Sequence, residues 1–377
     1  MKFLHTADWQ MGMKAVHTGS SARSLRDIRF KSASASVDIA KARNVDFVLL
    51  AGDTFEHHDV DEVIVKRTVE VINQFAPIPV FVLPGNHDPA SSGSVWKRQS
   101  WSSVIGDHVK LCDTPEPIPI GSHTILYPCP LKQKQSGLDP TNWIPSRAED
   151  DNLIRVGLAH GGLDILPSPP NFPISPKRTE LADLDYLALG DWHGLLEHGR
   201  SVYSGTMEPT SFGERDPGHV LIVEIPAAGE TPSIESVRVA QLRWKQFDLD
   251  LQDDSDVYQF ELELEKLQPL TSAVIRVNIS ASSSLTEAVA SKLRGIRTPL
   301  IEEAFFLDWA QEPEATDLED DEKLTFPGFF QSIHDDLTSM VNDEIPQGPG
   351  REFAGADPEI IRTTISLLRK LSREVEA

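Results

Sequence analysis

The chain has little cysteine and no long hydrophobic run, and each absence narrows what it can be. Its 377 residues include only two cysteines, Cys112 and Cys129, and no Cys-x-x-Cys pair. We therefore expect no disulfide framework, and we interpret both thiols as small core residues in a reducing compartment. No apolar run approaches the roughly 20 residues needed to span a bilayer, and the N-terminus, Met1–Asp8, is too short and too polar for a signal peptide. These absences predict a soluble, cytoplasmic protein with no membrane contact.

Positive charge is also scarce. Lys and Arg total 35 against 58 Asp and Glu, which gives a net charge of −23. Such a balance argues against a surface made mainly to grip nucleic-acid phosphates. It does not exclude a nucleic-acid substrate, because metal ions and a local patch can reverse the field where it matters. The acidity is uneven, since residues 301–322 hold ten carboxylates and no Lys or Arg. We interpret that segment as a solvated linker or surface face.

The first half of the chain alternates between strands and helices. Short apolar runs that predict buried strands recur at 2–6, 46–51, 79–83, 153–159 and 185–189. The periodic segments 24–43 and 61–75 predict helices between the first three of these strands. The alternation indicates parallel strands joined by crossovers, which present polar groups at the C-terminal edge of a sheet. From 202 to about 249, short runs punctuated by glycines predict an antiparallel second sheet.

Polar side chains follow these strands where each strand ends. Taken alone, Gly85-Asn86 fits an ordinary polar turn as well as a functional one. Repetition at the other strand ends overturns the ordinary interpretation. The collected candidates are Asp8, Gln10, Asp53, Asn86, His87, Asp88, His160, Asp191 and His193. Carboxylate, amide and imidazole ligands suit hard or borderline divalent metals, and so many donors indicate two ions rather than one.

These strand-end groups resemble a family signature. The motifs similar to the five of the calcineurin-like metallophosphoesterases are Asp8-x-Gln10, Gly52-Asp53, Gly85-Asn86-His87-Asp88, His160 and Gly190-Asp191-Trp192-His193. The chain resembles in particular the SbcD-type DNA-repair exonuclease subunits, which work with an SMC-like ATPase. The segments similar to that subgroup are His5–Asp8, Tyr203–Glu208 and Ser211–Glu214. The resemblance covers residues 1–225.

The resemblance implies a fold and a division into domains. Residues 1–250 would form an α/β metallophosphoesterase domain, a four-layer α/β/β/α sandwich of two mixed sheets. Residues 251–325 would form a small α+β capping domain that includes the acidic segment, and residues 326–377 a helical partner-docking region.

The resemblance also implies roles for the site residues. The ligands of the first metal would be Asp8, Asp53 and His193, and those of the second Asp53, Asn86, His160 and Asp191. The two ions would lower the pKa of a bridging water. His87 would stabilise the phosphoryl oxygens or protonate the leaving oxygen, and Asp88 would orient that imidazole.

Two positions depart from the family pattern, which usually has His at both. Gln10 offers a weak neutral ligand, so we expect the first metal to be held loosely. Asp191 adds a hard, negative oxygen, which favours Mn²⁺ or Mg²⁺ over softer ions, and we predict Mn²⁺-dependent activity. A degenerate site that binds metal without turnover is the rival interpretation of these two departures.

The loop at 89–101 mixes basic and aromatic residues, namely Trp96, Lys97, Arg98 and Trp101. Such a mixture can stack on bases and hold phosphates, so Trp96, Lys97 and Arg98 are candidate substrate-binding residues. The alternative is a surface loop that tucks its tryptophans into the domain.

A new unit begins near Asp253. A strand at 273–279 and a helix at 286–293 predict a small α+β module. At the end of the chain, 357–375 predicts a helix with one apolar stripe, formed by Ile361, Ile365, Leu368, Leu371 and Val375. This helix either packs on its own domain or docks on a partner.

Three functions compete. The leading hypothesis is a two-metal DNA nuclease, exonucleolytic on ends and capable of cutting single strands. Its partners would be DNA, an SbcC-like ATPase docked on the C-terminal helix, and a second copy of the chain. The alternatives are a phosphodiesterase for small phosphoesters and a catalytically weakened scaffold subunit of the ATPase complex.

Overall fold

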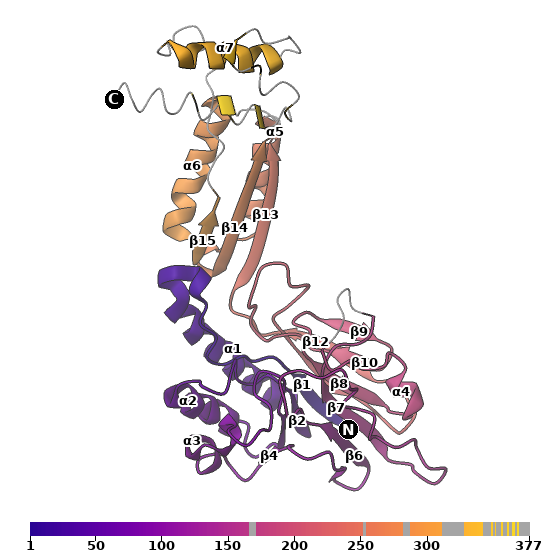
Figure 1. Cartoon of the computed structure of the whole chain (residues 1–377). Coiled ribbons are helices and arrows are strands. Elements are labelled where there is room, and N and C mark those ends of the chain that lie inside the picture. The colour runs from indigo at the N-terminus through magenta and orange to yellow at the C-terminus, as the bar shows by residue number, and fades with distance from the viewer. Residues whose placement is uncertain are drawn as a thin grey trace.

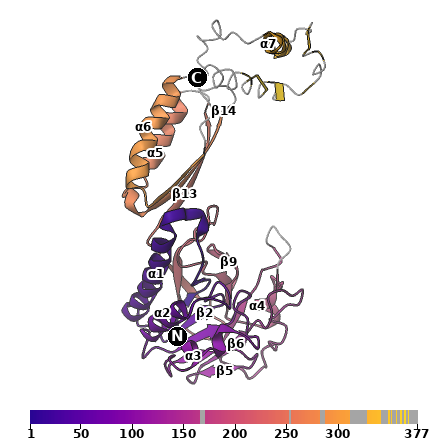
Figure 2. The same ribbon diagram turned by 60° about the vertical axis from the view of Figure 1, so that its left-hand side comes forward.

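The computed structural model describes residues 1–165, 171–251, 254–281, 287–310 and 328–341. It also describes residues 348–349, 351, 356, 360–361, 364–365 and 368. A broad sandwich domain carries an elongated arm, which rises from one side of it (Figures 1 and 2).

The first sheet of the sandwich has six strands. In spatial order they are β12 (Ser233–Arg238), β11 (His219–Glu224), β1 (Lys2–Thr6), β2 (Phe47–Ala51), β3 (Val80–Leu83) and β4 (Val109–Leu111). β1 to β4 run parallel, and β11 and β12 extend the sheet with antiparallel pairings. The helices α1 (Ala22–Ala42) and α2 (Glu62–Asn73) are the crossovers between the first three strands. Short helical turns, η2 (Val95–Lys97) and α3 (Gln99–Ser102), follow β3.

The second sheet also has six strands. In spatial order they are β5 (Ile118–Ile120), β6 (Thr124–Cys129), β7 (Ile154–His160), β8 (Tyr186–Gly190), β10 (Ser201–Tyr203) and β9 (Leu196–His198). Its four central strands are parallel and its two edge strands antiparallel. The outer face is covered by the one-turn helix α4 (Arg178–Leu181) and by irregular segments.

The period-two alternation of strand side chains explains the layering. In β1 and β2, Phe3, Phe47 and Leu49 point into the core between the two sheets, whereas Leu4 and Val48 face the helices. Phe3 stacks on Phe47 with ring centroids 5.0 Å apart. Because both faces of β2 are buried, its sequence is a continuous apolar run. The expected sandwich of two mixed sheets is confirmed.

The arm (the described residues of 243–310) is a three-stranded parallel sheet with two helices. Its elements are β13 (Arg243–Leu251), α5 (Asp254–Glu265), η3 (Leu270–Ser272), β14 (Ala273–Ala281), α6 (Glu287–Glu303) and β15 (Phe306–Trp309). β14 lies between the other two strands and is parallel to both.

Three expectations for this region need correction. The strands from 202 onward do not form one antiparallel sheet, because β10, β11 and β13 belong to three different sheets. The arm begins at Arg243 rather than at 251, since β13 pairs with β14 along its whole length. β15 falls inside the acidic segment expected to be a solvated linker or surface face, where its parallel pairing with β14 holds it as a strand.

The arm contacts the sandwich at the start of α1. Met13 and Leu25 form a buried cluster there with Leu242 and Val274. The short helix η1 (Val16–Ser21) precedes α1, and its Ser21 hydroxyl donates to the Phe305 carbonyl at 3.3 Å. Figure 2 shows this end of α1 directly beneath the arm.

A further helix, α7 (Phe329–Val341), lies at the far end of the arm (Figure 1), inside the region 326–377 that was expected to be helical, although no helix was placed at these residues from sequence. Leu337 of α7 is buried with Ile361 and Ile365, two members of the stripe in the expected C-terminal helix, and Leu368 packs against them. Most of that helix, 357–375, lies outside the described residues. Among the described helices, none is both long enough and apolar enough to cross a membrane.

Candidate metal centre

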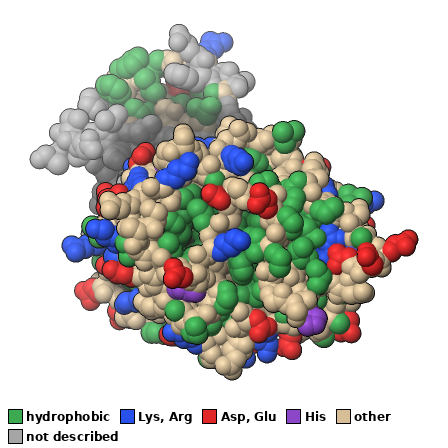
Figure 3. Space-filling view, turned by 90° about the horizontal axis from the view of Figure 1, so that it is seen from below, with side chains coloured by type: hydrophobic (Ala, Val, Ile, Leu, Met, Phe, Trp, Pro, Cys, Tyr) green, Lys and Arg blue, Asp and Glu red, His purple; other side chains and the backbone are tan. Residues whose placement is uncertain are grey.

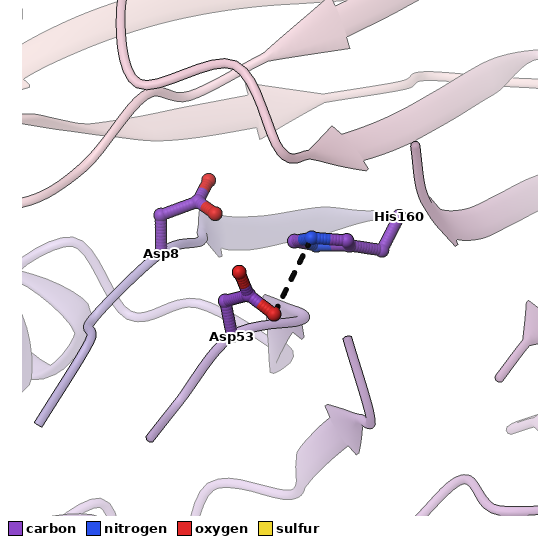
Figure 4. A group of neighbouring side chains, drawn as sticks. All are labelled: Asp8, Asp53 and His160. Carbon is purple, nitrogen blue, oxygen red and sulfur yellow. Dashed lines mark ion pairs between the residues drawn. The ribbon is translucent and has the colours of Figure 1, made fainter. Parts of the chain in front are cut away.

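The expected site residues meet at the edge of the sandwich where the parallel strands of both sheets end. Asp8 follows β1, Asp53 follows β2, and His160 is the last residue of β7. One ligand atom from each of these three lies within 4.8 Å of the others, and all three side chains are buried (Figure 4). Asn86 after β3 and Asp191 after β8 come from the neighbouring strand ends. Each sheet therefore supplies part of the group.

The backbone is left-handed at the acidic members of this group. The φ angles are 52° at Asp8, 49° at Asp53 and 100° at Asp191, and Gln10 has 44°. Side chains other than glycine rarely adopt this region, at a cost of about 1–3 kcal/mol each. Four such residues at one sheet edge mark a place where side-chain position outweighs local stability.

His160 is oriented by the backbone of the opposite sheet. Its Nδ1–H donates to the Ala51 carbonyl at 2.9 Å, which turns Nε2 toward the group. Nε2 lies 2.7 Å from Asn86 Oδ1, 3.4 Å from Asp53 Oδ1 and 3.8 Å from Asp191 Oδ1. The four residues expected to hold the second metal therefore converge on one point. An imidazole fixed through its other nitrogen is typical of metal-binding histidines.

His193 is oriented in the same way, by a residue not singled out from sequence. Its Nδ1–H donates to the Glu214 carboxylate at 2.8 Å. Its Nε2 lies 2.9 Å from the Gln10 side-chain nitrogen. Asp8 lies in the same half of the group as His193 and Gln10, and its carboxylate accepts the backbone N–H of Asp191 at 3.2 Å. Glu214 had appeared only as part of a motif, and its spacing to His193 gave no indication of the contact.

Charge in the group is unbalanced. Burial raises the pKa of Asp8 to about 7 against the pull of His160 and His193, and Asp53 and Asp191 add to the rise. Burial opposes a charge on His160, yet the carboxylates of Asp53, Asp8 and Asp191 together outweigh it and raise the pKa of His160 well above its ordinary value. Asp8, which is buried, and Asp191, which is half-buried, are carboxylates with raised pKa values beside imidazoles that retain protons, and a bound cation would favour the ionised form of both carboxylates.

The donor set fits divalent metals. Oxygens from Asp8, Asp53, Asn86 and Asp191 accompany imidazole nitrogens from His160 and His193, and hard oxygens with imidazole suit Mn²⁺, Mg²⁺ or Zn²⁺. His160 Nε2 and Asn86 Oδ1 would be among the atoms that hold a cation, and His160 would bind it through a deprotonated Nε2.

Comparison with known proteins agrees with this geometry. Residues 1–223 of the 377 match the family described as calcineurin-like phosphoesterase. The chain belongs to this family. Calcineurin-like phosphoesterases use divalent metals, and Asp8, Asp53 and His160 are a group that could hold one.

Three curated relatives are similar to parts of the chain. The SbcD component of the nuclease SbcCD from Staphylococcus saprophyticus is 24% identical over 259 residues, 60% of this chain and 66% of the relative. The DNA double-strand break repair protein Mre11 of Aeropyrum pernix is 27% identical over 292 residues, which are 68% of this chain and 65% of the relative. The uncharacterized metallophosphoesterase YhaO of Bacillus subtilis is 25% identical over 238 residues, which are 59% of this chain and 57% of the relative. The chain thus spans less than two thirds of the length of each relative.

A solved structure, the calcineurin-like phosphoesterase YfkN of Bacillus subtilis, has a TM-score of 0.34 and 13% identity to this chain. The matched region covers 71% of this chain and 98% of the YfkN chain. A TM-score this low carries no information on the site.

In this member of the family, His87 stands beside the candidate metal group, and Asp88 makes different contacts from the ones expected. The His87 Nδ1–H donates to the Glu56 carbonyl at 2.8 Å, and Nε2 lies 4.0 Å from Asp53 Oδ2. The carboxylate of Asp88 accepts the N–H groups of Phe55 and Gly85 at 2.9 and 2.7 Å. Asp88 is fully buried and ties the β2 loop to the β3 loop. The expectation that Asp88 orients the imidazole is therefore corrected.

The candidate substrate-binding loop is mostly turned inward. Trp96 is only 3% exposed, packs between Phe55 and Trp101, and donates its indole N–H to the Asp88 carbonyl at 2.5 Å. Arg98 donates to the carbonyls of Val60 and His58. These contacts agree with the alternative interpretation, in which the loop packs its tryptophans into the domain. Because Trp96 is buried, it cannot stack on a base. Lys97 is exposed and stays a candidate.

Arg29 is a supporting residue that sequence reasoning missed. It is buried, and its guanidinium donates to the carbonyls of Trp9 at 2.7 Å and Glu208 at 2.8 Å. It thereby fixes the turn that follows Asp8. The available signal was its spacing, since Arg29 lies four residues after Leu25 on the buried face of α1.

We expect Gly85→Ala to damage the centre. A Cβ at Gly85 would lie 2.1 Å from Asp53 Oδ1 and 2.4 Å from the Asp53 backbone nitrogen, so Asp53 would have to move. The free energy of unfolding should fall by about 1–3 kcal/mol, the range for overpacking, and metal binding should weaken. Urea titration and calorimetry measure both. Gly93→Ala, whose Cβ would meet nothing within 4 Å, is the matched control. Equal behaviour of the two variants would contradict the prediction.

Proposed function

We propose that this chain is a metal-dependent phosphodiesterase that cleaves DNA, acting on ends and on single strands. The observation that carries the proposal is the convergence of Asp53, Asn86, His160 and Asp191 on one point, with the unshared Nε2 of His87 beside it. Two of the similar proteins are named as part of a nuclease and as a DNA break repair protein, which supports DNA as the substrate.

The proposed roles follow from these positions. Asp8, Gln10 and His193 would hold one divalent ion and the four converging residues the other, with Asp53 shared. When bound, the ions supply positive charge to the phosphoryl oxygens and lower the pKa of water. His87 is held through Nδ1 by the Glu56 carbonyl, so its Nε2–H can donate to a phosphoryl oxygen or to the leaving oxygen.

The surface charge fits a subunit that relies on others for DNA affinity. On the face away from the arm, Lys and Arg side chains are scattered among acidic and hydrophobic ones (Figure 3). We propose that DNA is guided by the arm and that an SMC-like ATPase docks at the C-terminal region, where α7 exposes Phe329 and Phe330. A homodimer and a cytoplasmic location belong to the same proposal.

The test is digestion of end-labelled single- and double-stranded DNA with Mn²⁺, alone and with an SMC-like ATPase. Shortening of either substrate supports the proposal. Hydrolysis of bis-p-nitrophenyl phosphate without DNA cleavage would favour a small-phosphoester enzyme instead. Inactivity on all substrates, with the ATPase present, would favour a scaffold.

We expect Gln10→His to tighten the weaker metal. The Gln10 amide contacts His193 Nε2 at 2.9 Å, so an imidazole here would replace a weak neutral contact with a good nitrogen ligand. The Mn²⁺ concentration for half-maximal activity should fall by about 10-fold, the lower end of what site partners contribute. Metal titration measures it, with Gln74→His as the control. An unchanged or higher Mn²⁺ requirement would show that Gln10 is not a ligand position.

The metal preference is a second readout of the same titration. Mn²⁺ should support turnover better than Zn²⁺, because the oxygen-rich set with Asp191 is hard. Turnover with Zn²⁺ but not with Mn²⁺ would contradict the argument from ligand hardness.

A further inference from the structure

One loop connects the metal centre to the arm. This loop, residues 210–214 (the His193 loop), includes Glu214, which accepts the His193 Nδ1–H. Glu214 is also bound by its own loop, since the Thr210 N–H donates to it at 3.0 Å and the Ser211 hydroxyl at 3.3 Å. The carboxylate is therefore fixed relative to the loop backbone. Wherever the loop moves, the partner of His193 moves with it.

The opposite side of the loop is held by the arm. The Phe212 ring packs on Trp244 of β13, with centroids 4.9 Å apart. The Arg276 guanidinium of β14 lies 4.3 Å from the same ring centroid. Arg276 in turn pairs with Asp308 of β15 at 2.7 Å. All three strands of the arm thus contribute, directly or through Arg276, to the position of the Phe212 side chain. Phe212 lies two residues before Glu214 in the chain.

The rest of the loop has room to move. A cleft of about 370 Å³ borders it on the side of Asp191 and His193. A second cavity, of about 170 Å³, lies between the loop and the start of β13, where Arg243 and Trp244 line it. Space lies on both sides of the loop, so the contacts of Phe212 with the arm restrain where Glu214 lies, in addition to the hydrogen bond from His193.

We propose that the arm positions His193 for metal binding through Phe212 and Glu214. Phe212, Arg276 and Glu214 are positioning residues, and displacement of the arm weakens the metal half-site of Asp8, Gln10 and His193 alone. The other half-site does not depend on the loop, because His160 is held by the Ala51 carbonyl. The inference rests on the proposed metal centre, and it makes the arm a control on the number of ions bound.

Manganese binding tests the proposal without DNA. We would titrate Phe212→Ala and Arg276→Ala with Mn²⁺, following the ions by calorimetry and by the spin-coupled signal of a Mn²⁺ pair in electron paramagnetic resonance. The affinity for one ion should fall by about 10-fold or more, as for loss of other supporting partners, while the second ion binds as in wild type. The paired signal should give way to that of isolated Mn²⁺. Phe212→Tyr, which keeps the ring, should restore the pair.

The chain offers a matched control. Arg67 lies 3.9 Å from the Phe30 ring centroid and pairs with Asp27 at 2.8 Å, the same arrangement on the far side of the sandwich. Arg67→Ala should leave both ions unchanged. Loss of both ions in Phe212→Ala, or of neither, would overturn the proposal. If wild type binds two ions and cleaves no DNA, the proposed function fails while this inference stands.

Discussion

Asp53→Asn abolishes phosphodiester hydrolysis, with an expected loss of at least about 10³-fold, beyond the 10- to 100-fold that supporting residues contribute. Asp53 lies 3.4 Å from His160 Nε2 and 4.0 Å from His87 Nε2, and it is the carboxylate assigned to both ions. The variant keeps the shape of the side chain. It also keeps an oxygen that can accept the backbone N–H of His87, which lies 2.9 Å from Asp53 Oδ1 in the wild type. What it removes is the negative charge that would attract the two proposed cations.

The measurement is the rate of DNA and bis-p-nitrophenyl phosphate hydrolysis at saturating Mn²⁺, with bound metal counted on the same sample. Asp59→Asn removes an exposed carboxylate from the same β2–α2 loop and should leave the rate unchanged. Unfolding curves should show that Asp53→Asn is folded. Retention of rate within about 10-fold would mean that Asp53 bridges nothing.

His87→Ala separates catalysis from metal binding. The His87 side chain is 40% exposed beside the centre, with its Nδ1 held by the Glu56 carbonyl and its Nε2 facing Asp53. An acid or charge stabiliser in that position contributes about 10²–10⁴-fold, so the rate should fall by that factor. Since His87 is not assigned as a ligand, the count of bound Mn²⁺ should stay at the wild-type value.

The control for this variant is His123→Ala, an exposed histidine in the β5–β6 turn, which should change neither quantity. Loss of bound metal in His87→Ala would make His87 a ligand rather than a catalyst. Full activity would transfer the proton-donating role to another group. A substrate with a better leaving group should lose less rate in the variant if His87 protonates the leaving oxygen.

The strand ends of the first half were predictable because their signal is local. An apolar run that ends in a polar residue fixes both the strand and the edge at which the residue emerges, and Asp8, Asp53 and His160 meet accordingly. The arm was harder to predict. β13 has apolar residues at Phe247, Leu249 and Leu251, an alternation shared by parallel and antiparallel strands. Only its pairing with distant β14 distinguishes the two.

The fine roles within the site depended on contacts that sequence spacing does not encode. Asp88 follows His87 directly, yet adjacent side chains on a turn point apart, and Asp88 bonds to the backbone of Phe55 instead. Trp96 has the composition of a base-stacking loop, but a cluster with Phe55 and Trp101 buries it. Glu214 was missed as a partner of His193 for the same reason.

The position of His160 has a consequence for folding. It belongs to the second sheet, yet its ring is tied to the Ala51 carbonyl of the first sheet and reaches Asp53 and Asn86 there. Neither sheet alone contains a complete set of ligands, so a bound ion would cross-link the two sheets of the sandwich. Part of the free energy of metal binding is then free energy of docking one sheet on the other. We therefore expect removal of the ion to weaken the contact between the two sheets and to lower the free energy of unfolding.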